Sequence, residues 1–267
     1  MKILFIASAG SIHSIRWINY FVYKRNIKIT WITLSNPNNT TIKEFEKINK
    51  KIKIYNCRNI KNFFQIVFKF LTSNYDLVHI HYLGWNSLFS LFLNQKSKLV
   101  LTPWGSDLLS NKNFFKSLWF NFLFTKAEFV ICDSLRLANE AVKYGMNRKK
   151  ILISMFGVDT DFYKKTRSIF SKKNFYTVGS NRNLEEIYNV ITFIKAANII
   201  CKKRNDVYFY IAGDGSLKNK YIEYVNKNNI SEKVKFVGML NKGEMIDFYN
   251  KLDIYVSTSL SDGGLSA

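Results

Sequence analysis

The stretch "VKFVGMLNKGEMIDFYNKLDIYVSTSLSDGG" (residues 234–264) decides the fold class. Its two apolar runs, "VKFVG" and "LDIYVS", have the length of β-strands, and residues 242–250 between them have a helical period. Parallel strands joined through a helix form sheets that helices cover on both faces. The second run ends in a polar turn with two adjacent glycines, where α/β proteins bind ligands. The stretch therefore predicts an α/β protein with a ligand site at this edge of a sheet.

The same alternation extends along the whole chain and restarts once, after a polar, basic connector at 157–174. A restart of this kind predicts two domains joined by a linker. We expect two Rossmann-like, doubly wound parallel-sheet domains, 1–158 and 159–267, with a cleft between them. The predicted strands are 2–7, 28–34, 52–56, 76–80, 98–102, 128–132, 175–179, 207–212, 234–238 and 253–257, and the predicted helical segments are 14–25, 60–71, 106–124, 184–200, 216–228 and 242–250.

The charge is strongly positive, and most of the excess lies in the first half. The net charge is +21, of which residues 1–158 contribute +16 and residues 159–267 contribute +5. A basic surface suits nucleic acid, an anionic membrane face or an anionic small molecule. A coding bias toward Lys, Asn and Ile is an equal alternative explanation. No nucleic-acid-binding module is recognisable in the sequence.

Several protein classes are disfavoured by what the sequence lacks. The apolar run in "MKILFIASA" is shorter than the roughly 7 to 15 residues of a signal-peptide core, so we interpret it as a buried strand. No run approaches the ~18 apolar residues of a membrane span. Cys57, Cys132 and Cys201 form no CxxC pair, which indicates reduced thiols in a cytoplasmic protein.

The turn after the first strand, "SAGSIHSIRW", contains Gly10, followed by His13 and Arg16 at a helix start. The G-x-G-x-x-G pattern of dinucleotide-binding folds is absent, which argues against an oxidoreductase. His13 and Arg16 lie one helical turn apart, and this arrangement suits a phosphate or a sugar hydroxyl. The alternative is an ordinary surface turn.

Two further first-half motifs follow predicted strands. In "DLVHIHYLGW", His79 and His81 point to the same side of a strand, where they line the cleft or belong to the core. No third ligand accompanies them, so we expect no metal site. In "LTPWGSDLL", Trp104 is placed to form a wall against a sugar or base, and Asp107 belongs to a helix N-cap. The alternative is a cap with a buried tryptophan.

In the second half, two strand-to-helix turns have the composition of an anion site. "YTVGSNRNLEEIYN" places Gly179 at a strand end and Arg182 at the entry to the next helix, which suits a diphosphate. "YIAGDGSL" adds Gly213 and Gly215, where the backbone can approach a base or ribose closely. With "STSLSDGG", these turns are expected to converge on one sheet edge.

Taken in order, "DLVHIHY", "LTPWGSD", "GVDTDFY", "IAGDGSL" and residues 234–264 resemble glycosyltransferase family 4, the group 1 glycosyl transferases of GT-B fold. The resemblance covers essentially the whole chain. It implies a retaining enzyme whose second domain binds a UDP- or GDP-sugar and whose first domain binds the acceptor. It also implies that no metal cofactor is used, because basic side chains and helix N-termini neutralise the leaving diphosphate.

The resemblance also implies roles for individual residues. Arg182 and Asp262 are expected to be catalytic, and Gly10 to approach the donor from the first domain. The remaining expected donor contacts are Gly179, Tyr188, Gly213, Gly215, Ser259, Gly263 and Gly264, and the expected acceptor or cleft contacts are His13, Arg16, His81, Trp104 and Asp107.

This sequence departs from the family pattern at three places. It has "LEEIYN" where many members have a lysine after the arginine, and Trp104 where many have histidine. The two-glutamate motif begins with Asp262, and its second glutamate would fall eight residues on, beyond residue 267. We therefore expect an incomplete second domain.

These features favour a retaining glycosyltransferase that adds a sugar to a lipid-linked or cell-surface glycan in bacterial polysaccharide biosynthesis, such as lipopolysaccharide or capsule. Its expected place is the cytoplasm, peripheral on the inner membrane face, because "NFFKSLWFNFLF" combines lysine with apolar side chains. One alternative is an inactive, truncated remnant or partner of such an enzyme, which nucleotide affinity would distinguish. Another is a basic nucleic-acid-binding protein, which a gel shift would reveal.

Overall fold

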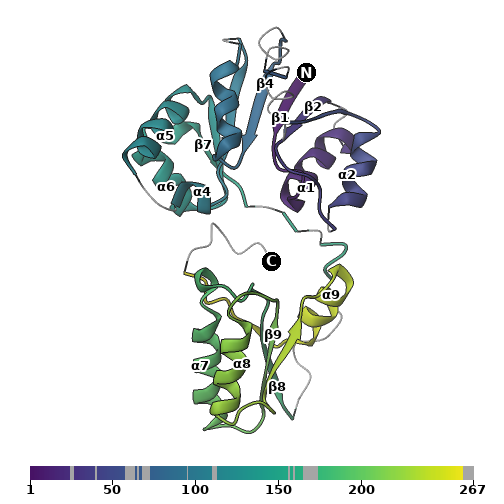
Figure 1. The fold of residues 1–267 in the computed structure, drawn as a ribbon, viewed down its shortest axis with the longest axis vertical. Coiled ribbons are helices and arrows are strands. Elements are labelled where there is room, and N and C mark those ends of the chain that lie inside the picture. The colour runs from purple at the N-terminus through teal and green to yellow at the C-terminus, as the bar shows by residue number, and fades with distance from the viewer. Residues whose placement is uncertain are drawn as a thin grey trace. The chain divides into compact units, whose positions relative to one another are not determined.

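The computed structural model describes residues 1–24, 27–39, 41–57, 64, 66–67, 73–94, 96–109, 113–155, 157–158, 160–164 and 174–260. The chain divides into two compact units, one covering Met1–Gly157 and a second that begins at Val158. Each unit has its own parallel sheet with helices on both faces (Figure 1). The predicted fold class, two doubly wound α/β domains, is confirmed.

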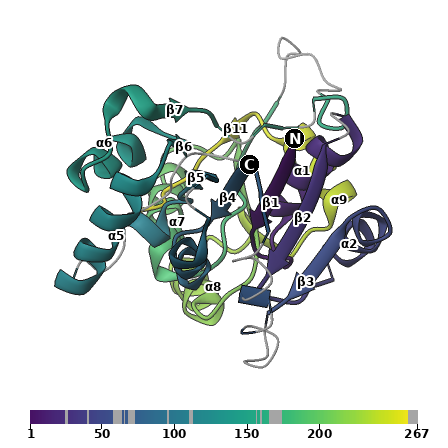
Figure 2. The ribbon, with the colours of Figure 1, turned by 90° about the horizontal axis from the view of Figure 1, so that it is seen from above.

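The first sheet has seven strands in the order β3-β2-β1-β4-β5-β6-β7, and every neighbouring pair is parallel (Figure 2). The order therefore reverses once, between β1 and β4. The strands are β1 (Lys2–Ile6), β2 (Lys28–Thr33), β3 (Lys53–Asn56), β4 (Leu77–His81), β5 (Lys98–Thr102), β6 (Phe129–Cys132) and β7 (Ile151–Ile153).

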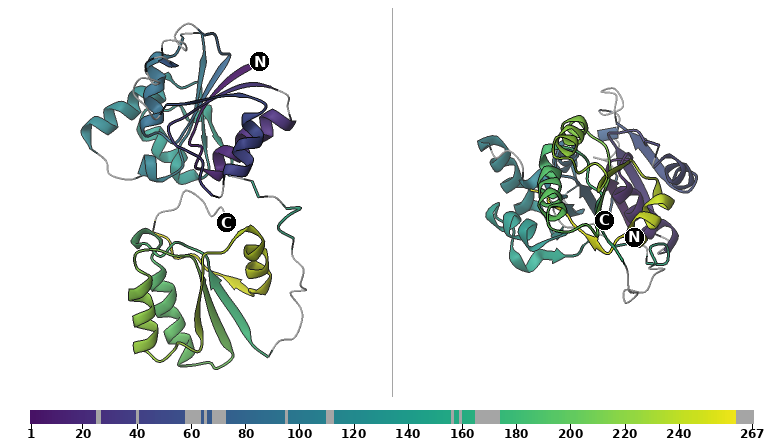
Figure 3. Two further views of the ribbon diagram at one scale, coloured as in Figure 1. Left: turned by 45° about the vertical axis from the view of Figure 1, so that its right-hand side comes forward. Right: turned by 90° about the horizontal axis from the view of Figure 1, so that it is seen from below.

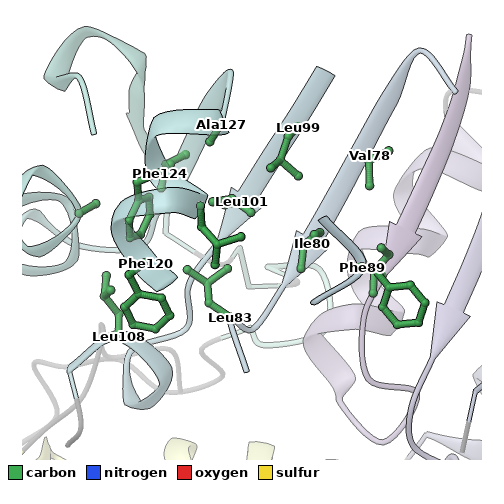
Figure 4. Close-up of a cluster of buried hydrophobic side chains, with 14 of the residues drawn as sticks. Val78, Ile80, Leu83, Phe89, Leu99, Leu101, Leu108, Phe120, Phe124 and Ala127 are labelled. Carbon is green, nitrogen blue, oxygen red and sulfur yellow. The ribbon is translucent and has the colours of Figure 1, made fainter. Parts of the chain in front are cut away.

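Helices bury the two faces of this sheet in separate clusters. Helices α1 (Ile12–Asn19) and α2 (Ile42–Asn49) cover one face, where Trp31 is fully buried. The 3-10 helix η2 (Trp85–Phe92), with α5 (Phe114–Lys126) and α6 (Leu135–Lys143), covers the other face. Figure 4 shows Phe120 and Phe124 of α5 pointing toward Leu101 of β5. The remaining elements are the π-helix η1 (Tyr20–Lys24), α4 (Ser106–Leu109) and η3 (Arg148–Lys150).

The first unit differs from the sequence prediction at two kinds of place. Strand β7 was not predicted, because it has only three residues, lies at the sheet edge and directly follows the basic 3-10 turn η3. The helix predicted at 14–25 begins earlier, since Ser11 caps it, and changes to π-helix at Tyr20. The helical region predicted at 106–124 is two helices, α4 and α5.

The second unit has a four-stranded parallel sheet in the order β10-β9-β8-β11. Helices α7 and α8 bury one face of it through residues such as Phe193 and Tyr221, and α9 lies on the other face (Figure 3). The strands are β8 (Tyr176–Ser180), β9 (Val207–Ala212), β10 (Val234–Gly238) and β11 (Ile254–Tyr255), and the helices are η4 (Glu186–Tyr188), α7 (Val190–Cys201), α8 (Lys218–Lys227) and α9 (Lys242–Lys251).

The helix predicted at 184–200 begins six residues later than expected, and this changes the setting of Arg182. Asn189 has a left-handed backbone with φ 48°, which asparagine tolerates better than most residues, and α7 starts only after it. The prediction that Arg182 sits at the helix entry is therefore wrong. Arg182 lies in the loop after β8, with the 3-10 turn η4 between it and α7.

Some predictions fall on residues outside the described ranges. Most of the helix predicted at 60–71 and most of the connector's second half belong to them. So do Asp262, Gly263 and Gly264 of the predicted donor motif.

Candidate functional site

Strand order identifies where each sheet can bind a ligand. In an open parallel sheet, ligands bind outside the carboxyl ends of the strands where the order reverses. That point lies between β1 and β4 in the first sheet and between β8 and β11 in the second. The loops that follow these four strands are therefore the candidate sites of the two units.

In the second unit, the loops after β8 and β11 bring a cation and two hydroxyl groups together. The Arg182 Nε donates to Ser257 Oγ over 3.3 Å, and Ser257 Oγ lies 3.2 Å from Ser259 Oγ. Arg182 and Ser259 were predicted site residues, whereas Ser257 was not. Ser257 lies two residues after β11, and this position at a strand end could have identified it from the sequence.

Asn181 fixes the loop that carries Arg182. Its side-chain nitrogen donates to the Tyr249 hydroxyl over 2.6 Å, and its oxygen accepts from the Tyr255 hydroxyl over 2.5 Å. Burial raises the pKa of Tyr249 to about 12, so this hydroxyl stays protonated at neutral pH. Sequence reasoning missed Asn181, although it directly precedes Arg182 at a strand end.

The turn that contains Gly213 and Gly215 packs backbone to backbone against residues 182–184. A Cβ atom on Gly213 would lie 2.5 Å from the Arg182 carbonyl oxygen, and one on Gly215 would lie 2.6 Å from that of Leu184. The Leu184 N–H also donates to the Asp214 carbonyl over 2.9 Å. Glycine is therefore required at both positions by packing within the protein. The turn contacts the backbone of the loop that carries Arg182.

Glu185 joins the same two loops through its side chain. Its carboxylate accepts from the Ser216 N–H over 2.8 Å and from the Ser216 hydroxyl over 2.6 Å. These hydrogen bonds lower the pKa of Glu185, so the carboxylate is ionised at neutral pH. The sequence prediction treated "LEEIYN" only as the absence of a lysine and missed this role.

The segment after β11 also contacts the loop before α7. The Thr258 hydroxyl donates to the Asn189 carbonyl over 2.9 Å, and the Leu260 N–H donates to the Ile187 carbonyl over 2.9 Å. Tyr188 and Ser259 are thus brought toward the Arg182 cluster. Gly179 is not, because its Cα faces Leu252, whose side chain would lie 2.5 Å from an added Cβ.

The second unit also has a pocket of about 550 Å³ away from these loops. Residues of β8, β9, β10 and α9 line it, including Thr177, Tyr210 and Phe248. None of the predicted donor residues lines this pocket. The loops after β8 and β11, where the order of the second sheet reverses, are therefore the candidate donor site.

In the first unit, the start of α1, the end of β4 and the loop after β5 bring three predicted residues together. The rings of His13 and Trp104 lie 5.7 Å apart in an edge-to-face arrangement, and those of His81 and Trp104 lie 6.1 Å apart. Trp104 and His13 are partly exposed, whereas His81 has no exposed surface. The partly exposed pair forms the surface of this cluster, and His81 lies beneath it.

His79 and His81 form a buried pair with ring centroids 4.2 Å apart. His79 Nε2 is 2.7 Å from the Thr102 hydroxyl, whereas neither ring nitrogen of His81 has a hydrogen-bond partner among the described residues. Burial lowers the pKa of His79 to about 3 and lowers the pKa of His81 well below its usual value. Both rings are therefore neutral, which agrees with the core interpretation. In the described part of the chain, no group of three or more His, Cys, Asp or Glu side chains is placed to hold a metal ion.

Asp107 is buried, and its carboxylate is occupied by backbone groups. Oδ1 accepts from the N–H groups of Trp104, Gly105 and Leu108 over 2.9 to 3.0 Å, and Oδ2 accepts from that of Leu83 over 2.7 Å. Burial raises the pKa of Asp107, and these four hydrogen bonds oppose the rise. Asp107 therefore ties the loop after β4 to the loop after β5 and positions Trp104. It is the second residue of α4 and not the residue before the helix, so the predicted N-cap position is one to two residues too late.

Gly10 and Arg16 lie at the edge of this cluster. The Gly10 carbonyl accepts from Asn38 Nδ2 over 2.9 Å, which fixes the loop after β1. Arg16 Nη1 is 3.5 Å from the Gly157 carbonyl oxygen. Burial lowers the pKa of His13, and the nearby Arg16 charge lowers it further, so His13 is neutral at pH 7.

The helices of the described part of the chain are short or carry several charged residues. None of them combines the length and the apolar character that crossing a bilayer requires.

Two domains, each with a parallel sheet and polar loops at its order reversal, are the architecture of the GT-B fold class, and solved structures share this fold with the chain. Anabaena HepE in complex with UDP and glucose matches with a TM-score of 0.70 and 17% identity, over 97% of this chain and 74% of HepE. A glycosyltransferase from Rickettsia africae matches with a TM-score of 0.74 and 18% identity, over 97% of this chain and 73% of that chain.

The sequence comparisons give the particular family. Residues 2–134 match the family described as Glycosyl transferase 4-like, and residues 161–265 match Glycosyl transferases group 1. The chain belongs to glycosyltransferase family 4. An uncharacterized glycosyltransferase of Methanocaldococcus jannaschii is 27% identical over 199 residues, which cover 70% of this chain. The match spans half the length of that relative.

Proposed function

We propose that this protein is a retaining glycosyltransferase that moves a sugar from a UDP- or GDP-sugar to a lipid-linked or cell-surface glycan in bacterial polysaccharide biosynthesis. In this proposal, residues 159–267 bind the donor and residues 1–158 bind the acceptor. The reaction belongs to the cytoplasm, at the inner face of the membrane.

The observation that carries the proposal is the position of Arg182. It follows β8 at the order reversal of the second sheet and contacts Ser257 from the loop after β11. A guanidinium held at such a point can donate two hydrogen bonds to a diphosphate. As the sugar leaves, negative charge grows on the diphosphate, and a fixed cation stabilises that charge without a metal ion.

The proposed acceptor side is the cluster around Trp104 in the first unit. Trp104 and His13 are partly exposed residues whose rings pack edge to face at the carboxyl edge of the sheet, and an aromatic face suits the apolar face of a sugar ring. Gly10 and Arg16 belong to the neighbouring loop and helix. In the donor site, Tyr188, Ser259, Asp262, Gly263 and Gly264 are proposed to contact the donor sugar and nucleotide.

The names of related structures support the donor and acceptor classes. HepE was solved with UDP-glucose as well as with UDP and glucose. Another structure with a TM-score of 0.70 is a lipopolysaccharide outer core galactosyltransferase, WaaB. These proteins favour a UDP-sugar donor and a glycan acceptor for this chain.

Calorimetry with UDP, UDP-glucose and a GDP-sugar tests the donor half of the proposal. The wild-type chain is expected to bind at least one of them, and Arg182→Ala to weaken that binding about tenfold or more, since a charged hydrogen bond contributes ~1.5 to 3 kcal/mol. Arg182→Lys keeps the charge and is expected to lose less affinity. Arg204→Ala is the matched control, because Arg204 pairs with Asp206 at the surface.

Two results would contradict the proposal. Undetectable affinity of the wild-type chain for every nucleotide would favour the inactive alternative. Equal affinity of the Arg182→Ala and Arg204→Ala variants would remove Arg182 from the donor site. Where turnover is observed, proton NMR of the anomeric centre of the product tests retention directly.

A further inference from the structure

Helix α5 is apolar on two opposite faces, and within the described ranges only one of them is covered. Phe120, Leu123 and Phe124 are buried in the core of the first unit. At 3.6 residues per turn, Phe114, Phe115, Leu118 and Phe122 share the opposite face. Their exposed fractions are 76%, 80%, 63% and 41%. We call these four side chains the α5 outer face.

This exposure is unusual for a helix at the surface of a globular protein. A surface helix normally turns one apolar stripe to the core and polar residues to water, and a helix apolar all round is normally buried. Exposed apolar side chains that gather on one face mark an interaction surface. The position of α5 at the periphery of the first unit leaves this face open (Figure 2).

The charges around α5 indicate the kind of partner. Residues 82–126 contain five lysines and one acidic residue, Asp107, which is buried. Lys126 lies beside the outer face, with its Nζ 5.6 Å from the Phe122 ring centroid and 2.8 Å from the Ser90 carbonyl oxygen. The next acidic residue along the chain, Glu128, pairs with Lys150. The segment that contains α5 is therefore basic, and Lys126 places one of its charges beside the outer face, which suits an anionic partner surface.

We infer that the α5 outer face is a membrane-docking surface that inserts into an anionic lipid bilayer. Aromatic and leucine side chains beside lysine are the composition of helices that lie in the bilayer interface, where apolar burial and attraction to anionic lipid add together. The helix does not cross the bilayer, because it has 13 residues. It lies on the surface with its outer face in the headgroup layer.

The position of α5 in the chain gives this docking a function. Helix α5 follows α4, which begins at the Asp107-capped turn that carries Trp104. Phe114 is the first residue of α5 and follows Trp104 by ten residues. The amino end of α5 is therefore the end that is closer in sequence to the Trp104 loop. Docking through this end would bring the carboxyl edge of the first sheet close to the lipid surface. This step rests on the proposed function, in which that edge receives a lipid-linked acceptor.

Flotation of the full chain with vesicles tests the inference. We expect binding to vesicles that contain 30% phosphatidylglycerol in phosphatidylcholine, weaker binding to pure phosphatidylcholine, and a decrease between low and high salt. The double variant Phe115→Ser with Leu118→Ser is expected to lower the partition coefficient about tenfold or more, because two apolar side chains no longer insert. Ile199→Ser with Met239→Ser is the matched control, since both residues are exposed apolar residues of the second unit.

Each outcome decides the inference. Equal flotation of the two double variants would overturn it, and so would wild-type binding that does not respond to phosphatidylglycerol. Sedimentation without lipid adds a second test, since dimers of the wild type that the α5 variant abolishes would assign the face to a second copy of the chain. Calorimetry with UDP-sugars separates this inference from the proposed function, because the α5 variant is expected to keep the wild-type donor affinity.

Discussion

At the residue scale, the most consequential side chain of the first unit is one that a ligand has little room to reach. Asp107 was predicted from the sequence as part of a helix cap beside a candidate sugar-binding tryptophan. The structure shows a buried carboxylate that accepts four backbone N–H groups from two loops. Its contribution to any site is therefore to hold Trp104 and Leu83 in place.

Substitution of Asp107 is expected to destabilise the first unit in a graded way. Asp107→Asn keeps one oxygen for three of the N–H groups but turns its NH2 group toward the Leu83 N–H. Asp107→Ala removes both acceptor oxygens and leaves four N–H donors without them. Since each unsatisfied buried group costs about 1 to 3 kcal/mol, we expect a loss of about 1 to 3 kcal/mol for Asn and a larger loss for Ala.

Urea unfolding followed by tryptophan fluorescence measures this loss in the first unit, because all five tryptophans precede residue 158. Glu46→Ala, an exposed change on α2, is the control and is expected to alter the free energy of unfolding by less than about 0.5 kcal/mol. The reverse order, with Asn more destabilising than Ala, would contradict the hydrogen-bond account.

At the scale of elements, the sequence predicted the sheets well and the loop that carries Arg182 poorly. Apolar runs located ten of the eleven strands in the described part of the chain, because a strand buried on both faces is a continuous apolar segment. Strand β7 was missed because only three residues pair, at the sheet edge. The late start of α7 was missed because one left-handed residue, Asn189, ends the 3-10 turn, and no periodicity reveals a single backbone angle.

The candidate donor loops show the same limit. Gly213 and Gly215 stood out in the sequence, and they were interpreted as places where a ligand approaches the backbone. In the structure, the segment that approaches them is residues 182–184 of the same chain. A glycine pattern shows that something comes close to the backbone, but only the tertiary structure shows which group that is.

Gly213→Ala is expected to damage the second unit and its proposed donor site together. Gly213 has φ +126°, and an added Cβ would lie 2.5 Å from the Arg182 carbonyl oxygen. We expect a loss of about 2 kcal/mol or more from backbone strain and overpacking, together with weaker UDP-sugar binding.

Gly238→Ala separates the two causes. Gly238 also has a positive φ, +76°, but apart from its chain neighbours no atom of the described residues lies within 4 Å of its added Cβ. This control is expected to cost only the left-handed strain, about 1 to 2 kcal/mol, and to leave donor binding intact. The measurements are urea unfolding by far-UV circular dichroism and calorimetry. Equal donor affinity of the two variants would show that the Gly213 turn does not position Arg182.

At the scale of the whole molecule, the titratable groups are distributed so that the two units respond differently to acid. All three histidines, His13, His79 and His81, lie in the first unit. Burial depresses the pKa of His79 to about 3 and depresses that of His81 strongly. The unfolded chain binds protons at these rings below pH 6.5 while the folded unit does not, so folding stability falls as the pH falls.

We therefore expect the first unit to lose about 2 kcal/mol per buried histidine between pH 7 and pH 5. Urea unfolding at pH 7, 6 and 5 measures this loss by tryptophan fluorescence, while circular dichroism reports both units. At pH 5 the first unit is expected to unfold at a lower urea concentration than the second. The fluorescence change is then complete before the circular dichroism change ends.

His81→Leu tests the origin of the pH dependence. Neither ring nitrogen of His81 has a hydrogen-bond partner among the described residues, so an apolar side chain of similar size removes no contact of that kind there. The variant is expected to keep its stability at pH 7 and to lose about half of the decrease toward pH 5. An unchanged pH slope would assign the acid sensitivity to other groups.

The close contact between the turns at 182–185 and 213–216 limits which positions of this protein can be varied by directed evolution. Residues 213 and 215 have no room for a side chain, and Glu185 is engaged by Ser216, so libraries at these positions would return mostly unfolded clones. Tyr188 and Ser259 are partly exposed and border the same loops without closing them. A search for altered sugar preference is therefore best confined to those two positions, where diversity is compatible with folding.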